Sequence, residues 1–366
     1  MKHLVVRQGE LKKFWNIMRG FGRRWDKINV MFHSNRAIFT SVRGGNILSY
    51  SAIYEGPKEA RTFFITPFAG GTAGDLTFHI PEEGAADGES SYSIGEFNLH
   101  NDLRTEAYPE ILDIEDDGFT MPSDLPKILR TILKIRSGQP TRRMGYFYFY
   151  NHNGINYICS RSDNAGIFFP MDMPNISGNM METKILKALP GGGLCSIKHN
   201  DEGRQSWLNY QSGAWLYIVP MDNFDIRRGN RFSDLLGSAV DLSAIKFTIE
   251  KSDVQKLLSP LDGFTTRRFR MTNPTCEITL AQSRPARASI SFRNSWGYSG
   301  DNPAPFDIPS LKITGSSLAR FKFSMLDFRN AYKAGFREFD VWAEINGTFT
   351  IRSSNKGFIF SSNCNG

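Results

Sequence analysis

The sequence predicts an α+β protein of three similar domains, because one local pattern occurs three times in its 366 residues. In each copy an acidic residue, Glu10, Asp124 or Asp253, stands three positions before a lysine. Apolar residues follow at i, i+3, i+4 and i+7, which predicts a helix with one buried stripe. The copies start 114 and 129 residues apart, so the repeats are domain-sized. The stripes are Leu11, Phe14, Trp15 and Met18; Leu125, Ile128, Leu129 and Ile132; and Val254, Leu257, Leu258 and Leu261.

Short alternating strands, rich in the 29 phenylalanines, surround each predicted helix. Such runs are typical of sheets with one buried face, and each domain is expected to begin with a strand, the helix and further strands. The Asn153-Gly154 pair predicts a hairpin turn in the second domain, and Asn35 predicts one in the first. The expected strands are 2–7, 28–32, 37–42 and 47–54; 118–121, 145–150, 155–160 and 166–170; and 246–249, 275–280 and 288–292.

Each domain also has a second, weaker half. Residues 181–189 predict a short helix followed by strands through 216–219, and residues 325–336 predict a clearer helix. In the first domain, residues 66–74 are rich in glycine and make a poor helix, so its second half is expected to be reduced. An acidic loop at 111–118 is expected to connect the first two domains. The strands expected after the last helix are 339–345, 349–352 and 357–360, and the domain boundaries are 1–115, 116–243 and 244–366.

The composition excludes several classes of protein. No run approaches the ~20 apolar residues of a membrane span, and no signal-peptide core follows Met1, so we expect a soluble cytoplasmic protein. The four cysteines are dispersed, which favours reduced thiols, and the six histidines lack metal-ligand spacing. We therefore expect no metal and no cofactor. The net charge of +7 is informative only where basic residues share a face.

Four stretches resemble the DNA polymerase sliding clamp, the bacterial beta-type processivity factor. Residues 108–129 (YPEILDIEDDGFTMPSDLPKIL) resemble the segment that connects the first domain of the clamp to the second. Residues 153–163 with 167–171 resemble its "LxxxATDGHRLA" segment. Residues 223–228 (NFDIRR) resemble "FPDYRR", and residues 323–360 match the closing helix and strands in order. Gly-His-Arg is replaced by Asn164-Ala165-Gly166, and the tail at 361–366 is polar. These departures indicate a divergent clamp, which a phage could encode.

The resemblance implies a homodimeric ring. Two chains joined head to tail would enclose double-stranded DNA, with helices lining a channel and antiparallel sheets outside, and would tether a DNA polymerase without chemistry of their own. A sliding channel needs positive charge near phosphates rather than base readout. The candidate DNA-binding residues are Lys12, Lys13, Arg19, Arg23, Arg24, Lys127, Arg130, Lys134, Arg142, Arg143, Lys184, Lys187, Lys198, Lys256, Arg267, Arg268, Arg329 and Lys333.

The resemblance also implies a groove for short peptide motifs of the polymerase and the clamp loader, between the second and third domains. An apolar anchor would enter a preformed pocket with a polar rim. Carried over by position, the groove residues are Met144, Ile167, Phe168, Phe224, Arg228, Ile359 and Phe360.

Two other functions stay open at this point. The alternating aromatics of 146–150 could stack single-stranded bases in a protein that forms no ring, and the chain could be a structural protein that only retains the clamp fold. An enzyme is disfavoured. The carboxylates of 113–117 are crowded into one expected loop, Gly191-Gly192-Gly193 lacks the Lys-Ser/Thr of a phosphate loop, and no nucleophile–base arrangement can be assigned.

Overall fold

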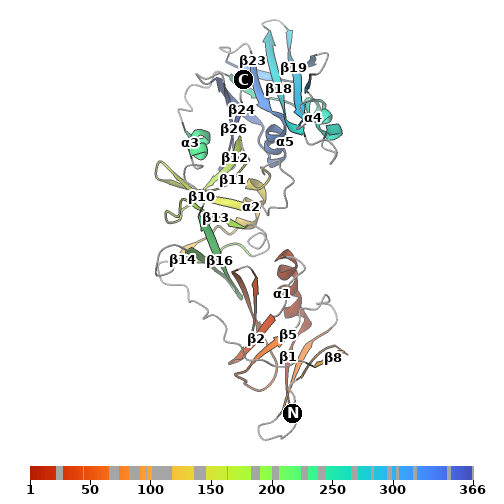
Figure 1. Ribbon diagram of the computed structural model, residues 1–366, viewed down its shortest axis with the longest axis vertical. Helices are drawn as coiled ribbons and strands as arrows, with labels where there is room; N and C mark the ends of the chain where they lie inside the picture. Colours follow the sequence, from red (N-terminus) through yellow and green to blue (C-terminus); the bar gives the residue numbers. More distant parts are fainter. Residues whose placement is uncertain are drawn as a thin grey trace. The chain divides into compact units, whose positions relative to one another are not determined.

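The chain forms two compact units in a computed structural model (Figure 1). Unit 1 comprises residues 1–127 and 181–222, and unit 2 comprises residues 128–180 and 223–366. The middle predicted domain contributes to both units, so the boundaries at 115 and 243 stay predictions. The structure describes residues 1–21, 28–43, 45–65, 74–81, 91–95, 97–100, 118–135, 146–162, 164–182, 190–199, 206–223, 230–237, 245–264, 271–281, 284–294, 299–301, 305–315, 320–343 and 348–364.

Unit 1 contains two antiparallel sheets. The first has the strand order β1-β6-β7-β8, and the second runs β5-β2-β3-β4 and continues through β16-β15-β14-β9. The strands are β1 (Lys2–Val6), β2 (Ile28–His33), β3 (Arg36–Arg43), β4 (Asn46–Ile53), β5 (Thr62–Ile65), β6 (Leu76–Ile80), β7 (Ser91–Ile94), β8 (Phe97–His100), β9 (Phe119–Thr120), β14 (Leu194–His199), β15 (Ser206–Ser212) and β16 (Trp215–Asn223).

Unit 2 repeats the arrangement. One sheet runs β13-β10-β11-β12 and continues through β26-β25-β24-β17, with β22 also paired to β17. A second sheet has the order β23-β18-β19-β20, and β21 pairs with β19. The strands are β10 (Tyr146–His152), β11 (Ile155–Arg161), β12 (Ala165–Pro170), β13 (Asn179–Glu182), β17 (Ile245–Thr248), β18 (Met271–Ala281), β19 (Arg284–Asn294), β20 (Ser299–Asp301), β21 (Phe306–Ile308), β22 (Lys312–Thr314), β23 (Arg320–Ser324), β24 (Glu338–Ala343), β25 (Phe349–Asn355) and β26 (Phe358–Cys364).

The predicted helices form where their apolar stripes meet these sheets. Helix α1 (Gln8–Phe21) buries its whole stripe, and the Phe14 ring lies 5.4 Å from Phe39 and 6.2 Å from Trp215. The stripe of α2 (Leu125–Ile132) is buried as well, and in α4 (Lys251–Phe264) Val254 and Leu257 are buried while Leu258 is half-buried. Helix α5 (Met325–Ala334) begins at the cap Ser324, whose hydroxyl accepts from the Asp327 amide.

One detail of the sequence prediction is wrong. Residues 181–182 belong to strand β13 rather than to a helix, and 183–189 lie outside the described residues. The reduced second half expected of the first domain stays a prediction. Strands β6, β7 and β8 follow the order that β14, β15 and β16 form later but are shorter, and residues 66–73 lie outside the described residues. Both expected hairpin turns are confirmed: Asn153 and Gly154 have φ of 51° and 82°, and Ser34 precedes Asn35 with φ of 56°.

The core of each unit is apolar and rich in aromatic rings. All four cysteines are buried and free, as the dispersed spacing predicted. Among the described helices, none is both long and apolar enough to cross a membrane. The described residues also hold no group of three or more side chains that could bind a metal ion.

Candidate functional site

The exposed side of α1 carries positive charge. Lys12, Lys13 and Arg19 are exposed, opposite the buried stripe. Lys13 is paired with Glu10 at 2.6 Å, whereas Lys12 and Arg19 form no ion pair with any described residue. The hydrogen bond from Lys13 and a second one of 2.7 Å from the Tyr50 hydroxyl lower the pKa of the Glu10 carboxyl. Glu10 therefore ties this helix to strand β4.

The other helices also present basic side chains. Lys127 and Arg130 are exposed on α2, Lys256 is exposed on α4 beside Asp253 at 3.3 Å, and Lys333 is exposed on α5. Within unit 2, Lys134 Nζ donates a 2.5 Å hydrogen bond to the Lys333 carbonyl oxygen just beyond α2. The polar side of each of these helices therefore carries long, positively charged side chains.

Two of the predicted basic residues differ from this pattern. Lys198 lies on strand β14 and not on a helix, half-buried and two residues from the buried Ser196 on the same face. Arg329 on α5 is half-buried, and its Nε has no hydrogen-bond partner among the described residues. The remaining candidates lie outside the described residues: Arg23, Arg24, Arg142, Arg143, Lys184, Lys187, Arg267 and Arg268, with Met144, Phe224 and Arg228 of the expected groove.

The described groove residues meet where β12 pairs with β26 in unit 2. Ile167 lies opposite Phe360, and Phe168 opposite Ile359. Neighbouring residues of a strand point to opposite faces, so the two pairs face different sides of the sheet. Phe360 lies 5.7 Å from the Phe336 ring on the side of α5, and it and Ile167 are no more than 1% exposed. That pair belongs to the core.

The opposite side of this junction is covered by a helix that the sequence analysis did not identify, α3 (Asn230–Leu236). The fully buried Phe232 lies 5.4 Å from the Tyr148 ring and 6.0 Å from the Phe168 ring. Leu235 and the half-buried Ile359 join the same cluster. The spacing of Phe232, Leu235 and Leu236 is helical and could have revealed α3, although only seven residues are involved.

A buried arginine holds the end of α3. Arg352 on β25 is 8% exposed, and its Nη2 donates to the carbonyl oxygens of Leu235 at 2.9 Å and Gly237 at 3.3 Å. Burial lowers the pKa of Arg352 from its ordinary value. A cation is favoured at a helix C-terminus because the last carbonyls carry partial negative charge.

The aromatic strand β10 lies within the same packing. Phe147 and Phe149 are fully buried on one face, and Tyr150 lies 5.1 Å from the Phe232 ring on the other. The two phenylalanines are closed to bases, and Tyr148 and Tyr150 are half-buried against Phe232. The single-strand-binding alternative rested on exposed aromatic rings in residues 146–150, and the packing of this strand therefore weakens it.

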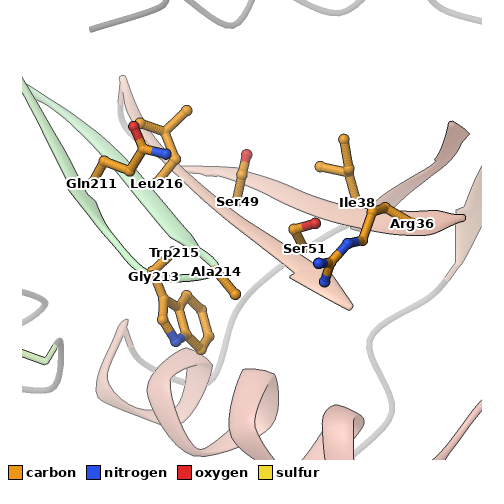
Figure 2. A pocket seen from close by; sticks show the side chains of 9 residues that line it. All are labelled: Arg36, Ile38, Ser49, Ser51, Gln211, Gly213, Ala214, Trp215 and Leu216. Carbon is orange, nitrogen blue, oxygen red and sulfur yellow. The ribbon is translucent and has the colours of Figure 1, made fainter. Parts of the chain in front are cut away.

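Unit 1 has a corresponding junction, where β4 pairs with β16. Leu216 lies opposite Ser49, and Tyr217 opposite Leu48. The Trp215 and Tyr50 rings are 4.3 Å apart on the α1 side. A hollow of about 380 Å³ opens at this junction (Figure 2), and the sequence analysis did not foresee it. It is lined by Arg36, Ile38, Ser49, Ser51, Gln211, Gly213, Ala214, Trp215 and Leu216.

Comparison with known proteins identifies the fold. No protein-family model matches the sequence, and no curated protein sequence matches it. The DNA polymerase sliding clamp of Bacillus subtilis is similar in structure at 12% identity and a TM-score of 0.64, with 99% of this chain and 98% of that chain covered. The sliding clamp of Pseudomonas aeruginosa is similar at 10% identity and a TM-score of 0.66, with 99% of each chain covered. The DNA polymerase III beta subunit of Thermotoga maritima is similar at 9% identity and a TM-score of 0.63, with 99% of this chain and 98% of that chain covered. The protein therefore has the DNA polymerase sliding-clamp fold over nearly its whole length.

Proposed function

We propose that the protein is a sliding clamp, which encircles duplex DNA and tethers a DNA polymerase to it without chemistry of its own. The observation that supports this function most is the match of 99% of the chain to solved sliding clamps. The exposed lysines and arginines on the polar sides of α1, α2, α4 and α5 supply the charge that such a ring needs. The expected setting is the cytoplasm of a bacterium or of a phage-infected host.

The strand pattern supports a ring of two copies. In unit 1, β4 pairs with β16, and in unit 2 the equivalent β12 pairs with β26. By the same rule β20 should pair with β8, yet each of them ends its sheet within the described strands. Open edges favour pairing with another chain, and a closed ring satisfies both edges at once. We therefore place β8 of one copy beside β20 of the other.

Native mass and DNA retention test this proposal together. We expect a dimer that stays on circular duplex DNA and leaves linearised DNA by sliding off its ends. Equal release from both forms, or a strictly monomeric protein, would contradict the ring. Binding should not depend on base sequence and should fall steeply with salt, because protein groups that bind phosphates release counterions.

Charge reversal on α1 tests the channel. The double variant Lys12→Glu, Arg19→Glu should bind DNA more weakly, and the slope of log K against log salt should fall by about one for each phosphate that the variant no longer neutralises. Lys58→Glu is the matched control, because Lys58 is exposed in unit 1 but lies outside the helices. Arg23→Glu with Arg24→Glu is expected to act in the same direction. If the α1 variant and the control bind alike, α1 does not line the channel.

We place peptides of the polymerase and the loader at the β12–β26 junction. Among the described groove residues, the half-buried Ile359 lies on the outer side beside α3. Phe168 is fully buried against Phe232 of α3, and Ile167 and Phe360 are core residues of the opposite face. A fluorescent peptide from the end of the cognate polymerase should lose affinity for Ile359→Asp. Unchanged affinity, with the variant still folded, would remove the groove from this position.

A further inference from the structure

We infer that the hollow at the β4–β16 junction, here called the unit 1 hollow, binds the C-terminal residue of a partner protein when that residue is apolar. The inference goes beyond the proposed function, because it assigns a second recognition site and does not depend on DNA binding. It rests on the equivalence of the two junctions, on their different side chains, and on the polar groups around the hollow.

The two junctions correspond residue by residue when counted from their hairpin turns. Trp215 follows the turn of β15 and β16, as Phe358 follows that of β25 and β26. Trp215 and Tyr50 then correspond to Phe358 and Phe169, and the ring distances are similar, 4.3 Å and 4.8 Å. One position further, Leu216 and Ser49 correspond to Ile359 and Phe168.

Different side chains at equivalent positions explain why the unit 1 junction is hollow. Ser49 stands where unit 2 has Phe168, and Thr40 stands where unit 2 has Cys159. In unit 2 the Phe232 side chain of α3 fills this side of the sheet. That packing shows that the outer side of such a junction accepts an apolar side chain from a separate segment.

The polar groups around the hollow indicate the rest of the ligand. Figure 2 shows the Arg36 and Ser51 side chains close together beside Ile38. Arg36 forms no ion pair with a described residue, although its charge helps to lower the pKa of the Glu10 carboxyl. The Ser51 hydroxyl and the Gln211 amide form no hydrogen bond with another described residue. The Ser49 hydroxyl, in contrast, is already bonded to Thr40 at 2.9 Å. One cation with adjacent hydrogen-bonding groups is suited to a carboxylate.

The wall of the hollow is fixed by the backbone. The Ser51 amide donates a 2.8 Å hydrogen bond to the Ala214 carbonyl oxygen, which attaches the β15–β16 turn to β4. Ile38 and Leu216 supply aliphatic surface on the same side. An apolar side chain and a carboxylate reach such a small space most easily from a single Cα. A C-terminal residue has both groups on one Cα, and a volume of about 380 Å³ is at the small end of ligand pockets.

The test is a fluorescence anisotropy titration with the peptide Gly-Ser-Gly-Leu-Phe, labelled at its N-terminus and ending in a free carboxylate. The same peptide with a C-terminal amide is the matched probe. We expect the free carboxylate to bind about 10- to 100-fold more tightly, the range for a charge-assisted hydrogen bond. Arg36→Gln should abolish that difference, and Lys58→Gln, an exposed control in the same unit, should keep it.

Ser49→Phe provides a second variant, because it places in unit 1 the side chain that unit 2 has at this position. It should block both peptides, while Arg36→Gln covers the case in which the larger side chain prevents folding. Equal affinity for the two peptides, no saturable binding, or unchanged binding by Arg36→Gln would overturn the site. Equal binding by a Leu-Phe-Asp peptide with an amidated end would overturn the choice of a chain terminus.

Discussion

The β4–β16 and β12–β26 junctions use the same backbone plan and complete it in different ways. In unit 1 the α1 side carries the specific contacts, because Glu10 bonds to the Tyr50 hydroxyl and Phe14 packs on Trp215. In unit 2 the specific contacts lie on the opposite side. There Phe232 of α3 packs on the sheet, and Arg352 donates a hydrogen bond to the C-terminal end of that helix. The repeated fold thus determines which strands pair at each junction. The individual side chains determine which face of the junction is covered by packed groups.

Removing Phe232 should have the largest effect on this difference. Phe232→Ala leaves a cavity among the Tyr148, Tyr150 and Phe168 rings, and truncation of a buried Phe lowers the free energy of unfolding by about 3–5 kcal/mol. Denaturant unfolding measures the change. Asp234→Ala is the control, because Asp234 is exposed on the same helix. Equal stability of the two variants would mean that α3 does not cover the junction in solution.

The strands and amphipathic helices of this fold could be predicted from sequence because their signals are local. The stripe of α1 is encoded within eight residues, from Leu11 to Met18, and all four side chains are buried. The pairing of β4 with β16 has no such signal. Ser49 and Leu216 are opposite one another although more than 160 residues separate them in the chain. Nothing in either segment alone encodes that register.

The candidate sites were predictable to a smaller extent for the same reason. The exposed lysines of α1 follow from the helix period, and their exposure agrees with it. The unit 1 hollow depends on the pairing of Ser49 with Leu216 across two strands. The packing of α3 on the unit 2 junction depends on the contact between the Phe232 and Phe168 rings. Both are long-range arrangements of side chains that look ordinary in sequence.

Loss of the Arg352 side chain should have an intermediate effect, confined to unit 2. Arg352→Ala leaves the Leu235 carbonyl, buried beneath the cluster, without its cationic partner, and an unsatisfied buried acceptor costs about 1–3 kcal/mol. Hydrogen exchange of the α3 amides should accelerate, while exchange in α1 should not change. Arg352→Lys, which keeps the charge, is the control. Equal acceleration in both helices would show a general loss of stability instead.

The smallest expected effect is the pH dependence of the Glu10 contact in unit 1. Hydrogen bonds from Lys13 and Tyr50 lower the pKa of Glu10 below its ordinary value of 4.5. The stabilisation is therefore complete above that value and is lost as the pH falls through the lowered pKa of the folded protein. The free energy of unfolding of wild type should fall over this acidic range toward that of Glu10→Gln, which lacks the titrating carboxyl and should show no such fall from this position. Phe169, the unit 2 counterpart of Tyr50, has no hydroxyl, so Phe169→Leu should not alter the pH profile. A wild-type profile parallel to that of Glu10→Gln would mean that the carboxyl is not held by Tyr50 in solution.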